Sequence, residues 1–287
     1  MSPSQMPIGV LFNTDRLDHG QFIEYACELE RMNIESLWLP ELFTRDPFAA
    51  AGVILGRTSK LNLATGIANI YARDPVAMVS SAATLQELSQ GRFILGLGVS
   101  NAGLNKARGH SWRPPVSKLR EYLSAMGAVK LSTPQPATPI HVAAHGPNML
   151  AAASELADGV NTYLMPQQHV GQAREVLGHS AALNTMLFCL NESDPAKARA
   201  TARKAVQYYM DLDYYHRAWR SFGFNDTDFA NGGSDALIDT LVAWGDTDHV
   251  RERIHQQYAN GATRVVVIPI GGQQGQPDWQ LLNAVSN

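Results

Sequence analysis

The chain has 287 residues, of which 45% are hydrophobic and 17% charged, and its formal net charge at pH 7 is −3. This apolar content supports a large folded core and excludes a disordered chain, which would combine low hydrophobicity with high net charge. The near-neutral charge gives no sign of a nucleic-acid-binding surface. We therefore expect a small-molecule partner and no nucleic acid.

Export and membrane insertion are not indicated either. Cys27 and Cys189 lack C-x-x-C spacing, which fits a reducing compartment and disfavours a disulfide framework or a zinc ribbon. The N-terminal residues show no basic leader with a long apolar stretch behind it. The longest uncharged run, residues 131–154, contains four prolines, whereas a membrane span needs about 20 mostly apolar helical residues. We expect a cytoplasmic protein with no membrane association.

Eight short runs rich in β-branched and aromatic residues predict strands, at residues 8–12, 36–39, 61–67, 93–97, 139–143, 160–164, 186–190 and 264–270. Each run is apolar almost throughout and does not alternate between apolar and polar residues. This pattern is typical of strands that are covered on both faces, as the strands of parallel sheets are.

Segments with helical periodicity lie between these runs. Residues 21–32 place Phe22, Tyr25 and Leu29 at spacings of three and four, which forms one apolar stripe along a helix. Pro75 suits the first turn of a helix over residues 75–88, and Gly91 suits a position just beyond its end. The same reasoning predicts helices at residues 118–131, 148–157, 169–177, 195–211, 234–244 and 248–260.

Strand and helix alternate eight times, which is the pattern of an α/β fold of the (β/α)8 TIM barrel class. The rival architecture is a doubly wound open sheet with a helical appendage. The barrel is favoured because Asn13, Thr14 and Asp15 follow the first strand, where a dinucleotide-binding sheet has G-x-G-x-x-G. We expect a single domain over residues 1–287, with an enlarged helical insertion of about 70 residues between strands 7 and 8.

In TIM barrels the chemistry lies at the carboxyl ends of the strands. The residues expected there are Asn13, Glu41, residues 67–69, 98–101 and 144–146, Thr162, Tyr163, Asn191, Glu192, Gly271 and Gly272. This set is polar but nearly uncharged, and it lacks His, Asp and Glu at metal-ligand spacing, so we predict no metal site. A serine hydrolase is disfavoured because no G-x-S-x-G sequence is present.

Several blocks of the sequence resemble a known family. Residues 61–75, LNLATGIANIYARDP, and residues 83–98, ATLQELSQGRFILGLG, are similar to the central signature of the bacterial luciferase-like monooxygenase superfamily. Three shorter blocks agree with it, SLWLPE at 36–41, AAHGPNML at 143–150 and ELADG at 155–159. The segment GGSDALIDTLVAWGD at 232–246 resembles one branch, the F420-dependent oxidoreductases of actinobacterial type.

The resemblance implies a TIM barrel that binds coenzyme F420 or FMN at its mouth and transfers a hydride to or from a small organic substrate. The late block favours F420, whereas the frequent Asn and Gln and the modest Arg content keep FMN open. With FMN, a separate flavin reductase would make the protein part of a two-component monooxygenase; with F420, an F420-reducing enzyme would be its partner. A non-catalytic flavin-binding protein is the alternative from another class. We also expect a homo-oligomer.

The resemblance also assigns cofactor contacts at the end of the third strand. F420-binding relatives often carry there a bulge with a non-proline cis peptide that supports the flavin ring from behind. The matching residues are Gly66, Ile67, Ala68 and Asn69, with the cis bond expected between the first two. A plain strand end at Gly66 is the structural alternative.

A second set of contacts is expected around the phosphate-bearing tail of the cofactor. By resemblance it consists of Ala143, Ala144, His145, Gly146 and Pro147, with Thr162 added from the end of the sixth strand. Small residues let the backbone approach a ligand, and the N–H groups at a helix start favour a phosphate. The pair Gly271 and Gly272 after the last strand is the second choice for this position.

Two departures from characterised relatives limit what can be carried over about catalysis. Their second strand ends in an acid followed by a catalytic histidine, whereas here Glu41 is followed by Leu42, and a proton-donating glutamate of the fourth strand corresponds to Asn101. We predict Glu41, Asn101 and Tyr163 as catalytic residues. A salt bridge from Glu41 to Arg45 or Arg73 is the structural alternative.

Three other side chains, Tyr71, Arg73 and His110, are further candidates for the general acid. The aromatic segment over residues 208–224 is expected to contribute to the core, and part of it to a lid over an apolar pocket.

Overall fold

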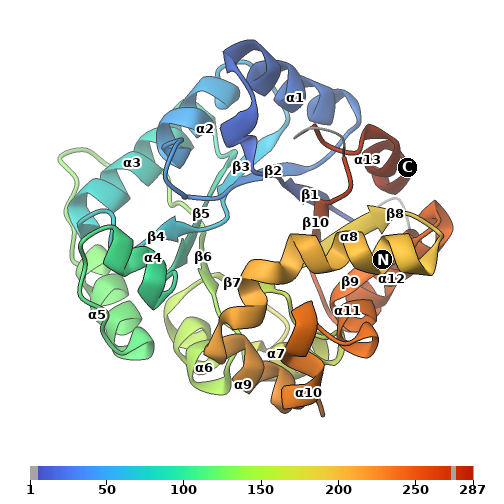
Figure 1. The fold of residues 1–287 in the computed structure, drawn as a ribbon. Helices are drawn as coiled ribbons and strands as arrows, with labels where there is room; N and C mark the ends of the chain where they lie inside the picture. The colour runs from blue at the N-terminus through green and yellow to red at the C-terminus, as the bar shows by residue number, and fades with distance from the viewer. Residues whose placement is uncertain (1–5, 273–275, 287) are drawn as a thin grey trace. The chain divides into compact units, whose positions relative to one another are not determined.

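A computed structural model of the chain describes residues 6–272 and 276–286 (Figure 1). The described residues fall into two compact units. The N-terminal unit is Leu11–Asn161, and the C-terminal unit consists of the described residues before Leu11 and after Asn161. The expected single domain over residues 1–287 stays a prediction.

The N-terminal unit is built on parallel strands. They are β2 (Ser36–Leu39), β3 (Asn62–Thr65), β4 (Ala68–Asn69), β5 (Phe93–Gly98), β6 (Ile140–Ala143) and the first part of β7 (Gly159–Tyr163). The strands pair in the order β2-β3-β5-β6-β7, and the two-residue strand β4 pairs with the end of β5. Since all pairs are parallel, the carboxyl ends of these strands lie at one edge of the sheet.

Helices cover the outer side of these strands. They are α1 (His19–Arg31), α2 (Pro47–Leu55), α3 (Pro75–Leu88), α4 (Ala102–Ala107), α5 (Pro115–Gly127) and α6 (Pro147–Leu156), with a 3-10 turn η2 (Thr14–Arg16) after the first strand. Figure 1 shows α2, α3 and α5 following one another around the strands. Helices α2 and α3 begin alike, because Asp46 and Asp74 accept hydrogen bonds from first-turn N–H groups and a proline follows each.

The C-terminal unit has its own parallel strands. They are β1 (Ile8–Leu11), β8 (Ala182–Asn191), β9 (Val242–Gly245) and β10 (Arg264–Pro269), paired in the order β1-β10-β8-β9. The helical elements are α7 (Gln168–Leu177), α8 (Pro195–Val206), η3 (Gln207–Asp211), α9 (Asp213–Arg220), α10 (Asp226–Phe229), η4 (Ala230–Gly232), α11 (Asp235–Leu241), α12 (Thr247–Ala259) and α13 (Trp279–Ser286).

All eight expected strands are present, and the enlarged helical insertion precedes the last of them. The third strand is interrupted, because β3 ends at Thr65 and the pairing resumes only in β4. The expected helix over residues 234–244 is wrong at its end: α11 stops at Leu241, and residues 242–245 form β9, whose backbone pairs with β8. The helix expected over residues 195–211 narrows to a 3-10 helix after Val206.

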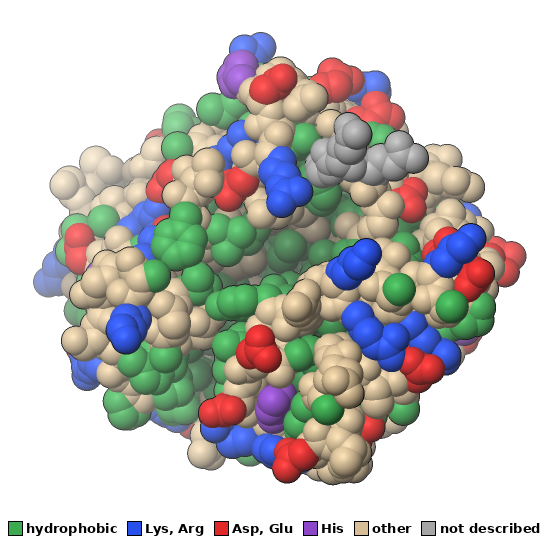
Figure 2. All heavy atoms as spheres, in the orientation of Figure 1, with side chains coloured by type: hydrophobic (Ala, Val, Ile, Leu, Met, Phe, Trp, Pro, Cys, Tyr) green, Lys and Arg blue, Asp and Glu red, His purple; other side chains and the backbone are tan. Residues whose placement is uncertain are grey.

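The charged side chains are spread over the surface. Figure 2 shows Lys and Arg interspersed with Asp and Glu on the face that it presents. Between α8 and α11, for example, Arg199 pairs with Asp239 and both Arg199 and Arg203 pair with Asp235. Pairs as exposed as these add little stability.

Among the described residues, every helix is too short or too polar to span a membrane.

Close packing between β3 and β5 fixes the position of the strand ends. The Thr65 hydroxyl donates to the Gly96 carbonyl at 2.7 Å and accepts from the Gly96 N–H at 2.9 Å. A Cβ atom at Gly96 would lie 1.9 Å from the Thr65 carbonyl oxygen, so the two backbones approach this closely only with glycine at position 96.

We therefore predict that Gly96→Ala lowers the free energy of unfolding by about 2 kcal/mol or more, since overpacking against a fixed backbone costs about 1 to 3 kcal/mol. Gly127→Ala is the matched control, because nothing lies within 4 Å of a Cβ atom there. Urea unfolding followed by circular dichroism measures both. Equal stability of the two variants would refute the close contact.

Candidate functional site

A backbone bulge interrupts the third strand at its carboxyl end. The peptide bond between Gly66 and Ile67 is cis, as the family resemblance implies. The Gly66 N–H donates to the Leu39 carbonyl at 2.8 Å, and the Glu41 N–H donates to the Ile67 carbonyl at 3.3 Å. The bulge is thus held on one side by the end of β2.

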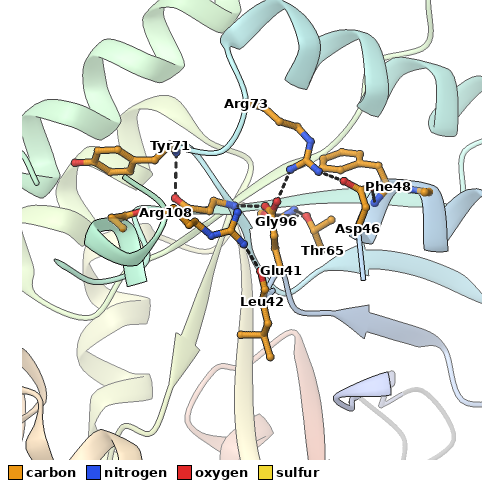
Figure 3. Close-up of polar contacts among 12 residues, drawn as sticks. Glu41, Leu42, Asp46, Phe48, Thr65, Tyr71, Arg73, Gly96 and Arg108 are labelled. Atoms are coloured by element: carbon orange, nitrogen blue, oxygen red, sulfur yellow. Dashed lines mark hydrogen bonds and ion pairs between the residues drawn. The ribbon is translucent and has the colours of Figure 1, made fainter. Parts of the chain in front are cut away.

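The Glu41 carboxylate binds the far end of the same bulge. Its Oε2 accepts from the Asn69 backbone N–H at 2.8 Å, and its Oε1 accepts from Nη1 of Arg73 at 2.7 Å (Figure 3). The Glu41 side chain is only 7% exposed. With its backbone on Ile67 and its side chain on Asn69, Glu41 spans the bulge from end to end.

Arg73 provides the charge that this buried carboxylate needs. Its guanidinium lies between the carboxylates of Glu41 and Asp46, and its Cζ atom is 4.5 Å from the centre of the Phe48 ring (Figure 3). A buried carboxylate without such a partner would be strongly destabilising. Of the two arginines considered as partners of Glu41, the structure selects Arg73, while Arg45 donates to the Leu17 carbonyl.

Two buried amides support the bulge from the side of α4. Asn69 Nδ2 donates to Asn105 Oδ1 at 2.8 Å, and Asn105 Nδ2 donates to the Val99 carbonyl at 2.8 Å. The Asn69 Oδ1 accepts from the Tyr71 N–H at 3.0 Å, so this amide also sets the start of the next loop. Asn101 accepts from the Leu104 N–H and caps α4.

Gly98 leaves room for the bulge above β5. The Ile70 N–H donates to the Gly98 carbonyl at 3.0 Å. A Cβ atom at position 98 would lie 2.8 Å from Cγ1 of Ile67 and 3.3 Å from Cβ of Ala143. The side chain of Ile67 therefore packs over a glycine, and the bulge and the expected phosphate loop meet across it.

The expected phosphate loop ends at an open helix start. Ala144 is buried and its N–H donates to the Asn161 carbonyl at 3.1 Å. Gly146 is the N-cap of α6, no side chain caps this helix, and residues 146–148 are exposed. The first-turn N–H groups of α6 therefore lack the capping carboxylate that α2 and α3 have, which leaves this end able to bind an anion.

The third expected catalytic residue, Tyr163, belongs to the C-terminal unit together with the expected contact residue Thr162, which is buried. The Tyr163 hydroxyl is 2.7 Å from that of Tyr209, and the Tyr163 ring also contacts Phe188. Burial, followed by the neighbouring Tyr209, raises the pKa of Tyr163 well above its ordinary value. Tyr163 is therefore a neutral phenol at physiological pH.

The structure brings together five of the predicted residues, Glu41, Gly66, Ile67, Ala68 and Asn69, at the bulge. Tyr71 and His110 lie elsewhere, with their rings 5.8 Å apart beside α5. Asn105 and Asp46 were not foreseen. The capping position of Asp46 before Pro47 is a visible sequence signal, whereas nothing in the sequence connects Asn105 with Asn69.

The family profile of the luciferase-like monooxygenases matches residues 6–264. The chain belongs to this family. A curated relative, the 5,10-methylenetetrahydromethanopterin reductase of Methanolobus tindarius, is 25% identical over 86% of this chain and 90% of its own length.

Solved structures show the same fold. The coenzyme F420-dependent tetrahydromethanopterin reductase of Methanopyrus kandleri has a TM-score of 0.70 at 21% identity, over 99% of this chain and 98% of its own. The FMN-bound oxygenating constituent of 3,6-diketocamphane monooxygenase from Pseudomonas putida has a TM-score of 0.70 at 16% identity, over 99% and 97%. The chain has the expected TIM barrel fold. Its relatives include F420- and FMN-dependent enzymes, which supports the expectation that this chain is an enzyme of the same kind.

We predict that Glu41→Gln releases the bulge locally. A glutamine side chain has one acceptor oxygen for two donors, so the Asn69 N–H or Arg73 loses its partner, and Arg73 keeps Asp46. Hydrogen bonds to charged groups contribute about 1.5 to 3 kcal/mol, so hydrogen exchange at the Asn69 amide should accelerate by about tenfold or more.

Asp46→Asn is the control for this experiment. It weakens the other partner of Arg73 but keeps a good capping residue before α2, and Asp46 does not touch Asn69. Unchanged protection of the Asn69 amide in Glu41→Gln, or equal loss in Asp46→Asn, would contradict the assigned role of Glu41.

Proposed function

We propose that the chain is an oxidoreductase that binds coenzyme F420 or FMN against the bulge after β3 and transfers a hydride between this cofactor and a small organic substrate. The observation that carries the proposal is the backbone bulge at residues 66–69, which Glu41 holds at both ends, in the position that the family resemblance assigns to the support of the flavin ring. The F420- and FMN-dependent relatives support the choice of cofactors.

Two parts of the N-terminal unit would hold the cofactor. The backbone of residues 66–69 would lie against the ring, with Glu41 keeping that backbone in place. The loop of residues 143–147 would hold the phosphate-bearing tail at the open start of α6. When bound, the cofactor supplies the hydride chemistry, and the protein contributes binding and orientation.

The three predicted catalytic residues differ in their ability to transfer a proton. The Glu41 carboxylate is engaged by Arg73 and Asn69, and Asn101 caps a helix, so in the proposal both act as positioning residues. Tyr163 carries a phenolic proton, but burial raises its pKa, so this phenol is a weaker acid than an ordinary tyrosine. Tyr163 belongs to the C-terminal unit, where its hydroxyl lies 2.7 Å from that of Tyr209, and its catalytic role stays a prediction.

The FMN-bound monooxygenase among the structural relatives supports a second candidate reaction. In that case the protein would be the oxygenating component of a two-component monooxygenase and would depend on a separate flavin reductase. The Glu41 carboxylate is already bound by Asn69 and Arg73, and Leu42 stands where characterised relatives have a catalytic histidine. Both features favour a third candidate, a flavin-binding protein without turnover.

Titration of the purified protein with F420 and with FMN, followed by fluorescence, tests the central proposal. We expect one of the two to bind with a dissociation constant in the micromolar range or below, and reduced cofactor to be oxidised in the presence of the correct substrate. Binding without turnover across a broad substrate panel would support the non-catalytic alternative. Binding of neither cofactor would refute all three candidates.

The variant Gly98→Ala tests whether the cofactor binds at the bulge. The added methyl group displaces Ile67, so we expect cofactor affinity to fall by about tenfold or more. The loss of stability should stay near 1 to 2 kcal/mol, because a side chain can move where a backbone cannot. Gly127→Ala again serves as control. Unchanged affinity in Gly98→Ala would place the cofactor elsewhere.

A further inference from the structure

A cavity of about 420 Å³ lies in the N-terminal unit, beside the bulge but outside it. Its walls are residues 70–75, which connect β4 to α3, then His110, and one side of α5. Pockets of roughly 300 to 1,000 Å³ are of the size that holds small organic ligands. None of the cofactor contacts proposed above lines this cavity.

One cation in the cavity has no partner of opposite charge. The ammonium of Lys118 lies 5.2 Å from the centre of the Tyr71 ring and 5.6 Å from that of Tyr122. No ion pair or hydrogen bond of this ammonium is found among residues 6–272 and 276–286. It is positioned by two aromatic faces instead of a carboxylate.

The other charged groups in the walls are already engaged. Arg73 is held by Glu41 and Asp46. Asp74 accepts from two N–H groups at the start of α3. Their charges are therefore compensated by the protein itself.

Glu121 lies one turn after Lys118 on α5, and its negative charge attracts the Lys118 ammonium. It would therefore compete with an anionic ligand for this ammonium. It forms an ion pair with Arg113. The hydrogen bond from Arg113 and, to a smaller extent, the charge of Lys118 hold the pKa of Glu121 below its ordinary value. Glu121 is therefore ionised, and its first partner is Arg113.

Aromatic rings form part of the cavity wall, next to the apolar residues Ile70, Ala72, Pro75 and Ala125. Tyr71 stacks on Trp112, with ring centres 6.0 Å apart and planes inclined by 12°, and its hydroxyl accepts from the Arg113 N–H at 3.1 Å. Tyr122 is buried, and its hydroxyl donates to the Arg73 carbonyl at 2.8 Å. These bonds fix both rings that flank Lys118, so the site is formed before any ligand arrives.

We propose that this cavity binds a planar aromatic carboxylate, with the carboxylate paired to Lys118 and the ring packed among Tyr71, Tyr122 and His110. Aromatic walls alone would also suit a cationic ligand, but the charge of Lys118 beside Tyr71 and Tyr122 repels a second cation. The volume accommodates a two-ring system. This inference does not depend on which cofactor the protein binds.

Calorimetric titration with 2-naphthoate tests this proposal, with 2-naphthamide and hexanoate as matched probes that lack the charge and the ring. We expect 2-naphthoate to bind and each of the other two to bind at least about tenfold more weakly. Absence of naphthoate binding, or equal affinity for the amide, would overturn the proposal.

Three variants locate the binding. Lys118→Met should weaken naphthoate binding by about tenfold or more, whereas Glu121→Gln should strengthen it, because it removes the competing carboxylate. Lys130→Met removes the same charge from an exposed position outside the cavity and should change nothing. Thermal unfolding of each variant verifies that it is folded. Equal affinity of Lys118→Met and Lys130→Met would contradict the assigned site.

Discussion

The contact between the Glu41 carboxylate and the Asn69 backbone N–H is the interaction on which the candidate site depends. It joins the end of β2 to the far side of the bulge, where the interrupted strand pairing resumes in β4. The contact is stable because Arg73 compensates the buried charge and is itself shared with Asp46. Without this compensation, burying the carboxylate would cost more than the hydrogen bond contributes.

Glycines provide the space in which this arrangement fits. Because Gly96 has no Cβ atom, the backbone of β5 can lie directly against the Thr65 carbonyl of β3. Gly98 likewise leaves room for the side chain of Ile67. The bulge is therefore surrounded by fixed backbone on one side and by a network of charge-assisted bonds on the other. Such a surface is preorganised, which reduces the cost of ordering groups when a flat ligand binds.

The strands were predictable because short apolar runs that are rich in β-branched residues and bounded by turn residues favour a buried strand over a helix. Residues 242–245 were missed because VAWG continues the apolar pattern of α11, and only pairing with β8 makes it a strand. Helix α2 was not foreseen, since PFAAAGVIL is apolar on every side and shows no helical period.

The site was predictable only in part. The block around Gly66 identified the bulge through its family resemblance, and Glu41 was placed at the correct strand end. The partner of Glu41 could not be chosen from the sequence, because Arg45 and Arg73 were both candidates. Only the path of the bulge decides between them. The bond between Asn69 and Asn105 joins residues 36 positions apart, and no periodic pattern marks it.

The most direct test of the account is a crystal structure of the protein with F420 or FMN bound. We predict electron density for the flavin or deazaflavin ring against the backbone of residues 66–68, with the phosphate at the start of α6 and the bond from Glu41 to Asn69 intact. A ring bound away from this bulge, or a phosphate held at Gly271 and Gly272 instead, would contradict the account.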